Sequence, residues 1–166
     1  MAKYKKAPPQ ALAPAPVPSN ASSASAIGRP TPSAQTAEKL RSMDQERAEF
    51  ALAKIQHICN GPETVQVEVR RYLNGLPALI RMNGLGQALA FYRMKGNGSS
   101  HELIYRMVGE WLCSVSCKGR VFTHDADVLT AIARSDIHHY MAAQNEALAL
   151  LEWLKKFALA LLKKEN

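Results

Sequence analysis

The adjacent residues His124 and Asp125 form the pattern in this sequence that comes closest to a metal-dependent catalytic site. An imidazole and a carboxylate can both bind a divalent metal ion, but a catalytic site needs further ligands from other parts of the chain. The residues that could complete such a set are His57, His101, Asp127 and Asp136. Asp125 also stands where a helix is predicted to begin, so a helix N-cap explains it without any metal.

The cysteines and the remaining histidines give weaker signals for a metal site. Cys113 and Cys117 lie four residues apart on one face of a predicted helix, but no nearby His or Cys supplies the other ligands at the usual spacing. Buried thiols are therefore the favoured interpretation. His138 and His139 would point about 100° apart on a helix, so they cannot bind one metal ion together. We expect no metal site and no cofactor.

Gly84 and Gly86 resemble half of a dinucleotide-binding fingerprint, but Leu89 stands where the third glycine belongs and no strand precedes them. We place both glycines inside a predicted helix, where each costs about 1 kcal/mol relative to alanine. Such a cost predicts that another helix, a partner's backbone or a phosphate chain approaches closely, and helix packing is favoured. The chain also lacks a P-loop and a GxSxG motif, and we predict that it is not an enzyme.

The chain has 166 residues, three cysteines and a formal net charge of +7. An odd number of cysteines without zinc-type spacing is typical of a reducing compartment rather than of a disulfide-linked secreted domain. The longest uninterrupted apolar run, Phe157 to Leu162, has six residues, whereas a helix that spans a membrane needs about 20. We therefore expect a cytoplasmic protein that does not enter a membrane.

Residues 1–35 differ in composition from the rest of the chain. The stretch up to Thr36 contains seven of the nine prolines and no acidic residue, so it cannot bury enough apolar surface to offset its conformational entropy. We interpret residues 1–35 as a disordered basic arm and residues 36–166 as a single helical domain. The arm carries four basic residues, and the other 17 basic and 14 acidic residues leave the domain at only +3. Any phosphate contact there must therefore come from a local patch.

Apolar residues recur at helical spacing through the predicted domain. The first helix is predicted from residue 37 to Cys59, with Thr36 as its N-cap. Residues 64–69 alternate like a strand but also fit a helix, and we predict a helix there. The next helices are predicted over 76–94 (with Pro77 in the first turn), over 100–117 (with Ser99 or Ser100 as its cap), over 125–133, and from Ser135 or Asp136 to 164. The predicted fold is all-α, a compact bundle of five or six helices behind the arm.

Two stretches of the chain resemble the small subunit of type III-B CRISPR effector complexes, subunit five of the Cmr series. In residues 76–91 the matching positions are Pro77, Ile80, Asn83, Gly84, Leu85, Gly86, Gln87 and Phe91. In residues 140–158 they are Glu146, Ala147, Leu148, Trp153, Leu154, Lys155 and Phe157. With the predicted first helix, the resemblance covers most of residues 40–162 and leaves out the arm.

The resemblance implies a small helical protein without catalytic activity that takes part in antiviral defence. Copies of such a subunit stack as a short filament beside the backbone nuclease subunits that hold the CRISPR RNA. They also contact the large polymerase-like subunit and line the groove in which target RNA pairs with the guide. The expected partners are therefore guide RNA, target RNA, these other subunits and copies of the chain itself.

Such a role needs cations spaced along a phosphate chain rather than pockets that read bases. The candidate RNA-binding residues are the basic side chains on the predicted helices: Lys54, Arg70, Arg71, Arg81, Arg93, Lys95, Arg106, Lys155 and Lys156. For each of them, a solvated helix face is the alternative. The aromatic residues Phe91, Tyr92, Trp111 and Trp153 are predicted to be core or subunit contacts, and no aromatic set suggests base stacking.

Two other functions remain open from the sequence. A short helix over 125–133 in front of a long one is also typical of a helix-turn-helix module that binds DNA or acts as an adaptor. The pair His124-Asp125 would instead indicate an HD-type metal phosphohydrolase. Both are weaker than the interpretation as a CRISPR small subunit.

Overall fold

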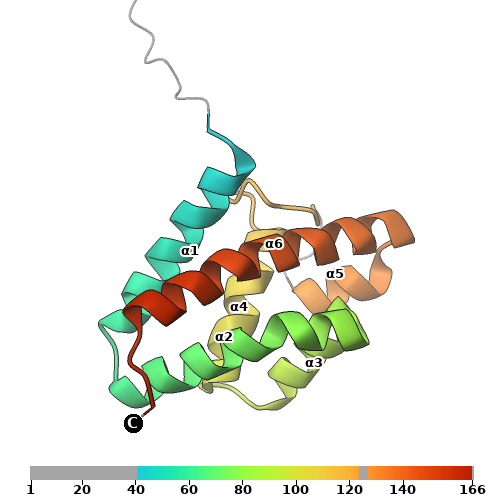
Figure 1. The fold of residues 1–166 in the computed structure, drawn as a ribbon. Coiled ribbons are helices and arrows are strands. Elements are labelled where there is room, and N and C mark those ends of the chain that lie inside the picture. Colours follow the sequence, from blue (N-terminus) through green and yellow to red (C-terminus); the bar gives the residue numbers. More distant parts are fainter. Residues whose placement is uncertain (1–40, 124–126, 166) are drawn as a thin grey trace, which may run out of the picture. The chain divides into compact units, whose positions relative to one another are not determined.

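A computed structural model describes residues 41–123 and 127–165. The described residues form six helices and no strand (Figure 1). The helices are α1 (Met43–Cys59), α2 (Glu63–Asn83), α3 (Leu85–Met94), α4 (Ser100–Cys113), α5 (Val128–Arg134) and α6 (Ile137–Leu161). They belong to one unit, Lys39–Asn166. The prediction of an all-α bundle is confirmed.

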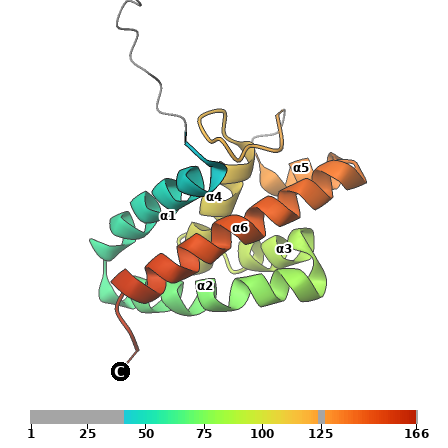
Figure 2. The same ribbon diagram turned by 45° about the horizontal axis from the view of Figure 1, so that its top comes forward.

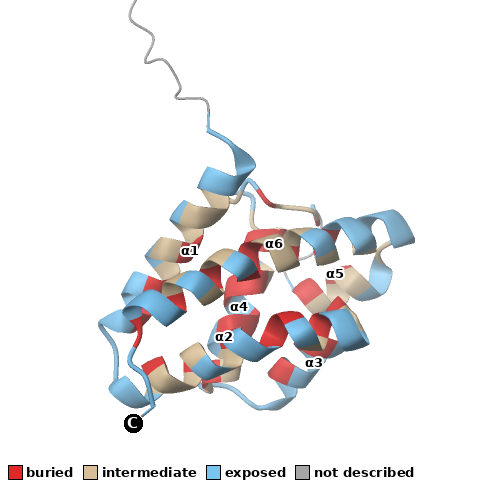
Figure 3. Ribbon diagram, viewed as in Figure 1, coloured by how far each residue is buried: buried red, intermediate tan, exposed pale blue. Residues whose placement is uncertain are grey.

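The long helix α6 is the centre of the packing. It lies along α1 and α2, as the turned view in Figure 2 shows, and it also contacts α3 and α4. Its inward face is formed by Ala143, Ala147, Leu150, Leu151, Leu154 and Ala158, all fully or almost fully buried. Every helix contributes buried residues to the common core (Figure 3). Burial of these apolar faces is what holds helices of this length together in water.

Helix α1 begins at Met43 because Ser42 caps it. The Ser42 hydroxyl accepts a hydrogen bond from the Gln45 backbone N–H, and the Gln45 side chain accepts one from the Ser42 backbone N–H. This reciprocal arrangement satisfies two N–H groups that a helix start leaves without partners. The predicted cap, Thr36, lies outside the described residues.

Helix α2 includes residues 64–69, so the prediction of a helix rather than a strand there is confirmed. The prediction that a new helix begins at Leu76 is wrong, because α2 continues without a break through Pro77. A proline inside a helix has no N–H to donate to the carbonyl four residues earlier. The helix stays continuous because Leu73, one turn before Pro77, and Ile80, about one turn after it, are completely buried in the core.

The break between α2 and α3 falls at Gly84, where sequence analysis expected helix. Gly84 has φ +82°, a left-handed value that favours glycine. A Cβ atom there would lie 2.6 Å from the Tyr140 hydroxyl of α6. The next residue, Leu85, donates its backbone N–H to the Gln144 side chain at 3.0 Å. Gly86 does lie in α3, close to Ile132 of α5, so close helix packing explains it.

Helix α4 is capped by Ser99 as predicted, but it ends at Cys113 instead of Cys117. The chain then turns back over the helix, and Gly119 lies against the indole of Trp111. A Cβ atom on Gly119 would come within 2.0 Å of the Trp111 ring nitrogen. This contact leaves no room for a side chain at residue 119, so glycine is required where the chain passes Trp111. Cys113 and Cys117 are half-buried and are not on one helix.

Helices α5 and α6 both begin at an aspartate. Asp127 caps α5 by accepting the Thr130 backbone N–H, whereas the expected cap, Asp125, lies outside the described residues. Asp136 caps α6, as one of the two predicted choices, and accepts the backbone N–H groups of His138 and His139. Helix α6 ends at Leu161, a few residues before the predicted end at Lys164.

One carboxylate joins three of the helices. Glu146 of α6 accepts two hydrogen bonds from Arg47 of α1, at 2.8 and 2.7 Å, and one from the indole N–H of Trp111 of α4, at 2.8 Å. Burial by itself would raise the pKa of Glu146, but the hydrogen bonds from Arg47 and Trp111 hold that pKa below its ordinary value. The charged carboxylate is therefore part of the folded state.

Replacing Glu146 by glutamine should lower the free energy of unfolding by about 2 to 4 kcal/mol. The amide removes the negative charge and turns an acceptor into a donor that faces the Arg47 guanidinium or the indole N–H. Because the pKa of Glu146 is lower in the folded state, its stabilising effect is present above the ordinary pKa of 4.5 and is lost as the pH falls below it. Urea unfolding at neutral and acidic pH measures both effects.

The control for this prediction is Glu152→Gln on the same helix. Glu152 is half-exposed and lies 3.9 Å from the exposed Arg81, so its loss should change stability by no more than about 0.5 kcal/mol. Equal effects of the two substitutions would show that Glu146 does not hold the helices together.

Replacing Gly84 by alanine should destabilise the protein by about 1 to 3 kcal/mol, because the left-handed backbone and the nearby Tyr140 hydroxyl both oppose a Cβ atom. The matched substitution Gly75→Ala lies in the interior of α2 with nothing within 4 Å of the new atom. It should stabilise the protein by about 0.5 to 1 kcal/mol. Thermal melts of the two variants should therefore move in opposite directions, and a shared direction would contradict this account of the break.

Candidate nucleic-acid interface

The nine basic residues predicted to bind RNA are spread over five of the helices and do not form one continuous patch. Helix α2 contributes the most, with Arg70, Arg71 and Arg81. The others come from α1, from α3 and the residue that follows it, from α4 and from α6. Their neighbours decide which of them can contact a ligand.

Lys54 and Arg70 are used inside the protein. The Lys54 ammonium lies 2.7 and 2.8 Å from the two oxygens of Glu110, which ties α1 to α4. Arg70 donates hydrogen bonds to three backbone carbonyls at the end of α6. The shortest of these, to the carbonyl of Leu159, is 2.7 Å. Since the last carbonyls of a helix have no partners within it, Arg70 acts as the cap of α6. We therefore leave both residues out of the interface proposed below.

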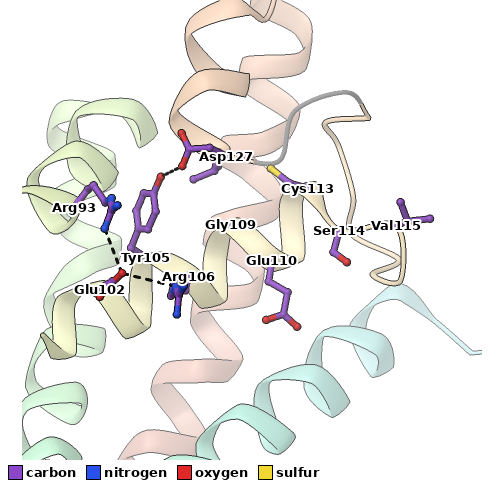
Figure 4. Close-up of a pocket in the computed structure, with 11 residues that line it drawn as sticks. Arg93, Glu102, Tyr105, Arg106, Gly109, Glu110, Cys113, Ser114, Val115 and Asp127 are labelled. Carbon is purple, nitrogen blue, oxygen red and sulfur yellow. Dashed lines mark hydrogen bonds and ion pairs between the residues drawn. The ribbon is translucent and has the colours of Figure 1, made fainter. Parts of the chain in front are cut away.

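Arg93 and Arg106 share one acidic partner at the edge of an open cavity of about 680 Å³ (Figure 4). The Glu102 carboxylate lies 3.2 Å from Arg93 and 3.8 Å from Arg106, and Figure 4 shows it between the two guanidinium groups. On the far side of the cavity the Tyr105 hydroxyl donates to Asp127. The cavity therefore presents charges of both signs, and Arg106, with 75% of its side chain exposed, is the cation best placed to meet an external anion.

Arg81, Lys155 and Lys156 lie on neighbouring parts of α2 and α6, which we call the α2–α6 face. Arg81 reaches to within 3.9 Å of Glu152, which lies one turn before Lys155 on α6. Lys155 forms no ion pair with any residue that the structure describes. The Lys156 ammonium lies 5.4 Å from the centre of the Trp153 ring. These three cations and the carboxylate of Glu152 give the α2–α6 face a positive net charge.

A second open cavity, of about 610 Å³, lies between α2, α3 and α4. It is lined chiefly by Arg71, Tyr72, Phe91, Tyr92, Lys95 and His101, and we call it the aromatic groove. The rings of Tyr72 and His101 lie with their centres 3.7 Å apart and their planes tilted by 31°. The Lys95 ammonium lies 4.6 Å from the centre of the Phe91 ring, and the Arg71 guanidinium lies over Tyr72 at 5.0 Å.

Two titratable groups of the aromatic groove, His101 and Tyr92, have pKa values that favour the uncharged form. Burial and the nearby Lys95 charge lower the pKa of His101 from its ordinary value of 6.5. Burial raises the pKa of Tyr92 to about 12, and its hydroxyl donates to the Tyr72 carbonyl at 2.9 Å. At pH 7 the groove therefore offers neutral rings beside the positive charges of Arg71 and Lys95.

Most residues of the sequence signature serve the fold. Pro77, Ile80 and Leu85 are buried, Gly84 makes the turn described above, and Asn83 donates to the Leu79 carbonyl at 3.4 Å. Gln87 is exposed on α3. Trp153 is half-buried, packs on Phe157 and donates its indole N–H to Asp44 at 2.9 Å. Phe91 was predicted to be either a core residue or a subunit contact, and since 41% of it is exposed it is not a core residue.

The alternatives drawn from the sequence gain no support in the described part of the chain. No group of three or more potential metal ligands occurs there, and His124 and Asp125 themselves lie outside it. In a helix-turn-helix module the short and long helices pack on each other, whereas α5 packs mainly on α3 and α4. Among the described helices, none is both long and apolar enough to cross a membrane.

Comparison with known proteins decides the family. The family model for CRISPR-associated protein Cas_Cmr5 matches residues 43–161, which run from the first residue of α1 to the last residue of α6. The chain belongs to the Cmr5 family. The resemblance seen in residues 76–91 and 140–158 is therefore confirmed at the level of the family.

A curated sequence and a crystal structure, both from Thermus thermophilus, show how far the likeness extends. A protein described as CRISPR system Cmr subunit Cmr5 is 31% identical over 124 residues, which cover 74% of this chain and 98% of the relative. The crystal structure of a CRISPR-associated Cmr5 family protein matches with a TM-score of 0.61 and 29% identity, over 74% of this chain and all of that one. The shared part is the helical unit.

Sequence analysis missed the aromatic groove of this Cmr5 family member. Its residues come from three helices, and sequence analysis treated Phe91 only as a core residue or subunit contact and His101 only as a possible metal ligand. The only local signal was the spacing of four residues between Phe91 and Lys95, which places the two side chains together on consecutive turns. No periodic pattern brings Tyr72 and His101 together, because the turn at Gly84 and the loop after α3 decide where those residues meet.

Proposed function

We propose that this chain is the non-catalytic small subunit of a type III-B CRISPR effector ribonucleoprotein. In this proposal, its copies stack into a filament that helps to hold guide RNA and target RNA for antiviral defence. The observation that carries the proposal is the match of the whole span from α1 to α6 to the Cmr5 family. The name of the Thermus thermophilus relative as a Cmr subunit supports it.

The α2–α6 face is our candidate for contact with the RNA backbone. Arg81 and Lys156 are exposed and Lys155 is half-exposed, so their charges can reach phosphate groups. Contacts to phosphates fix the position of a nucleic acid without reading its sequence. That is what a guide–target duplex requires, because base pairing already supplies the specificity. Weak contacts of one copy add up when several copies bind along one duplex.

The protein partners in this proposal are the backbone nuclease subunits, the large polymerase-like subunit and further copies of the chain, all in the cytoplasm. A stacking subunit needs apolar surface for protein contacts. Met82 of α2 is 81% exposed and Ile137 of α6 is 65% exposed. Unpartnered apolar side chains of this size support a role in assembly.

Co-purification tests the proposed assembly directly. The tagged full-length chain, expressed from its native locus, should sediment in a gradient with a large particle that contains guide RNA and the other subunits. Sequencing of the bound RNA and mass spectrometry of the proteins identify the particle. A chain that sediments only as a small protein, without RNA, would contradict the proposed function.

Reversal of two charges on the α2–α6 face should weaken the capture of target RNA by the assembled particle. The double variant Arg81→Glu with Lys155→Glu should lower affinity by about tenfold or more at low salt, because fewer phosphate contacts release fewer counterions on binding. The matched variant Glu152→Gln removes the one carboxylate beside Arg81 and should raise affinity. Equal affinities of wild type and both variants would remove this face from the proposal.

A further inference from the structure

The aromatic groove combines flat apolar surface with positive charge in a way that the fold alone does not require. The Phe91 ring is 41% exposed, although α3 buries Leu85, Ala88, Leu89 and Tyr92 on its other face. A half-exposed phenyl ring contributes less to stability than a buried one. Its position beside Lys95 therefore points to a ligand rather than to packing.

The charges around the groove favour an anionic ligand. Arg71 and Lys95 are the ionised groups that line it, and no carboxylate does so among the described residues. Of the nearby acids, Glu68 already accepts a hydrogen bond from Ser100 at 2.7 Å. Glu165 lies 3.9 Å from Arg71 and both side chains are mostly exposed, so water weakens this pair. A phosphate can therefore compete for Arg71.

We propose that the aromatic groove binds an unpaired RNA base, which stacks on the exposed Phe91 ring while Arg71 and Lys95 hold the neighbouring phosphates. This inference rests on the proposed function, which brings RNA to the protein. Base stacking on aromatic side chains tolerates all four bases, as a subunit that meets any target sequence requires.

The Lys95 side chain can move from the Phe91 ring to a phosphate when a base binds. Its ammonium now lies over the Phe91 ring, but the lysine stem is flexible and its three donors accept many directions. A base that stacks on Phe91 would displace the ammonium to an adjoining phosphate. The Tyr72 and His101 rings lie beside this position, and the lowered pKa of His101 favours its uncharged form.

Titration of the isotope-labelled full-length chain with two RNA probes tests the groove. One probe is hexauridylate, and the other is a hexamer of the same charge without bases. The amide resonance of His101 should shift with hexauridylate and not with the abasic hexamer, whereas that of Lys95, which holds a phosphate, should shift more strongly with hexauridylate than with the abasic hexamer. NMR detects binding even in the millimolar range, so weak affinity of a single copy does not hide the result.

Substitution of Phe91 by leucine should weaken binding of hexauridylate by about five- to tenfold, since the stacking surface is lost while apolar bulk remains. The matched control is Phe50→Leu. Phe50 also lies beside a lysine ammonium, that of Lys54 at 5.1 Å, but Glu110 neutralises this lysine. The control should bind both probes as the wild type does.

The outcomes separate this inference from the proposed function. Equal binding of both probes, no shift in the groove, or no effect of Phe91→Leu would each overturn base stacking. The proposed function would then remain, because the sedimentation of the particle and the charge variants of the α2–α6 face test it separately. Groove resonances that move with another subunit and not with RNA would assign the groove to protein docking and overturn the inference as well.

Discussion

The carboxylate of Glu146 is the contact on which the arrangement of helices depends most. It joins residues 99 and 35 positions away in the sequence, so that α1 and α4 are both tied to the central helix α6. A charge at such a half-buried position is stable only with its hydrogen-bond partners in place. The same Trp111 that donates to Glu146 also supports the turn at Gly119, so this network positions the loop after α4 as well.

The internal ion pairs also decide which surface remains positive. Lys54 binds Glu110 and Arg70 caps α6, so two of the cations that an RNA-binding subunit would use are taken up by the fold. Exposed candidate cations remain on the α2–α6 face, around the aromatic groove and, as Arg106, at the cavity beside Glu102. A net charge of +7 for the whole chain therefore says less about RNA binding than the identity of each cation's neighbour does.

The differences between the predicted and observed helices have one physical origin. Pro77 is a common helix start and Gly84 is tolerated inside helices, so the sequence favours a boundary at residue 76. In the structure, burial of Leu73 and Ile80 on either side of Pro77 keeps α2 continuous. The approach of Tyr140 and Gln144 from α6 then sets the turn at Gly84. The contacting residues lie about 60 positions away in the chain. The helix preferences of residues near Gly84 therefore cannot reveal these contacts.

The sequence by itself determined the all-helical class, the caps of α4 and α6 and, through residues 76–91 and 140–158, the Cmr5 family. These features depend on periodicity, short-range hydrogen bonds and ordered motifs, which neighbouring residues encode. Only the tertiary structure decided that Lys54 and Arg70 bind partners within the protein, that Phe91 stays exposed, and that Tyr72 meets His101. The reason is that the surroundings of a side chain are set by the docking of separate helices, and such docking leaves no trace in the spacing of residues along one helix.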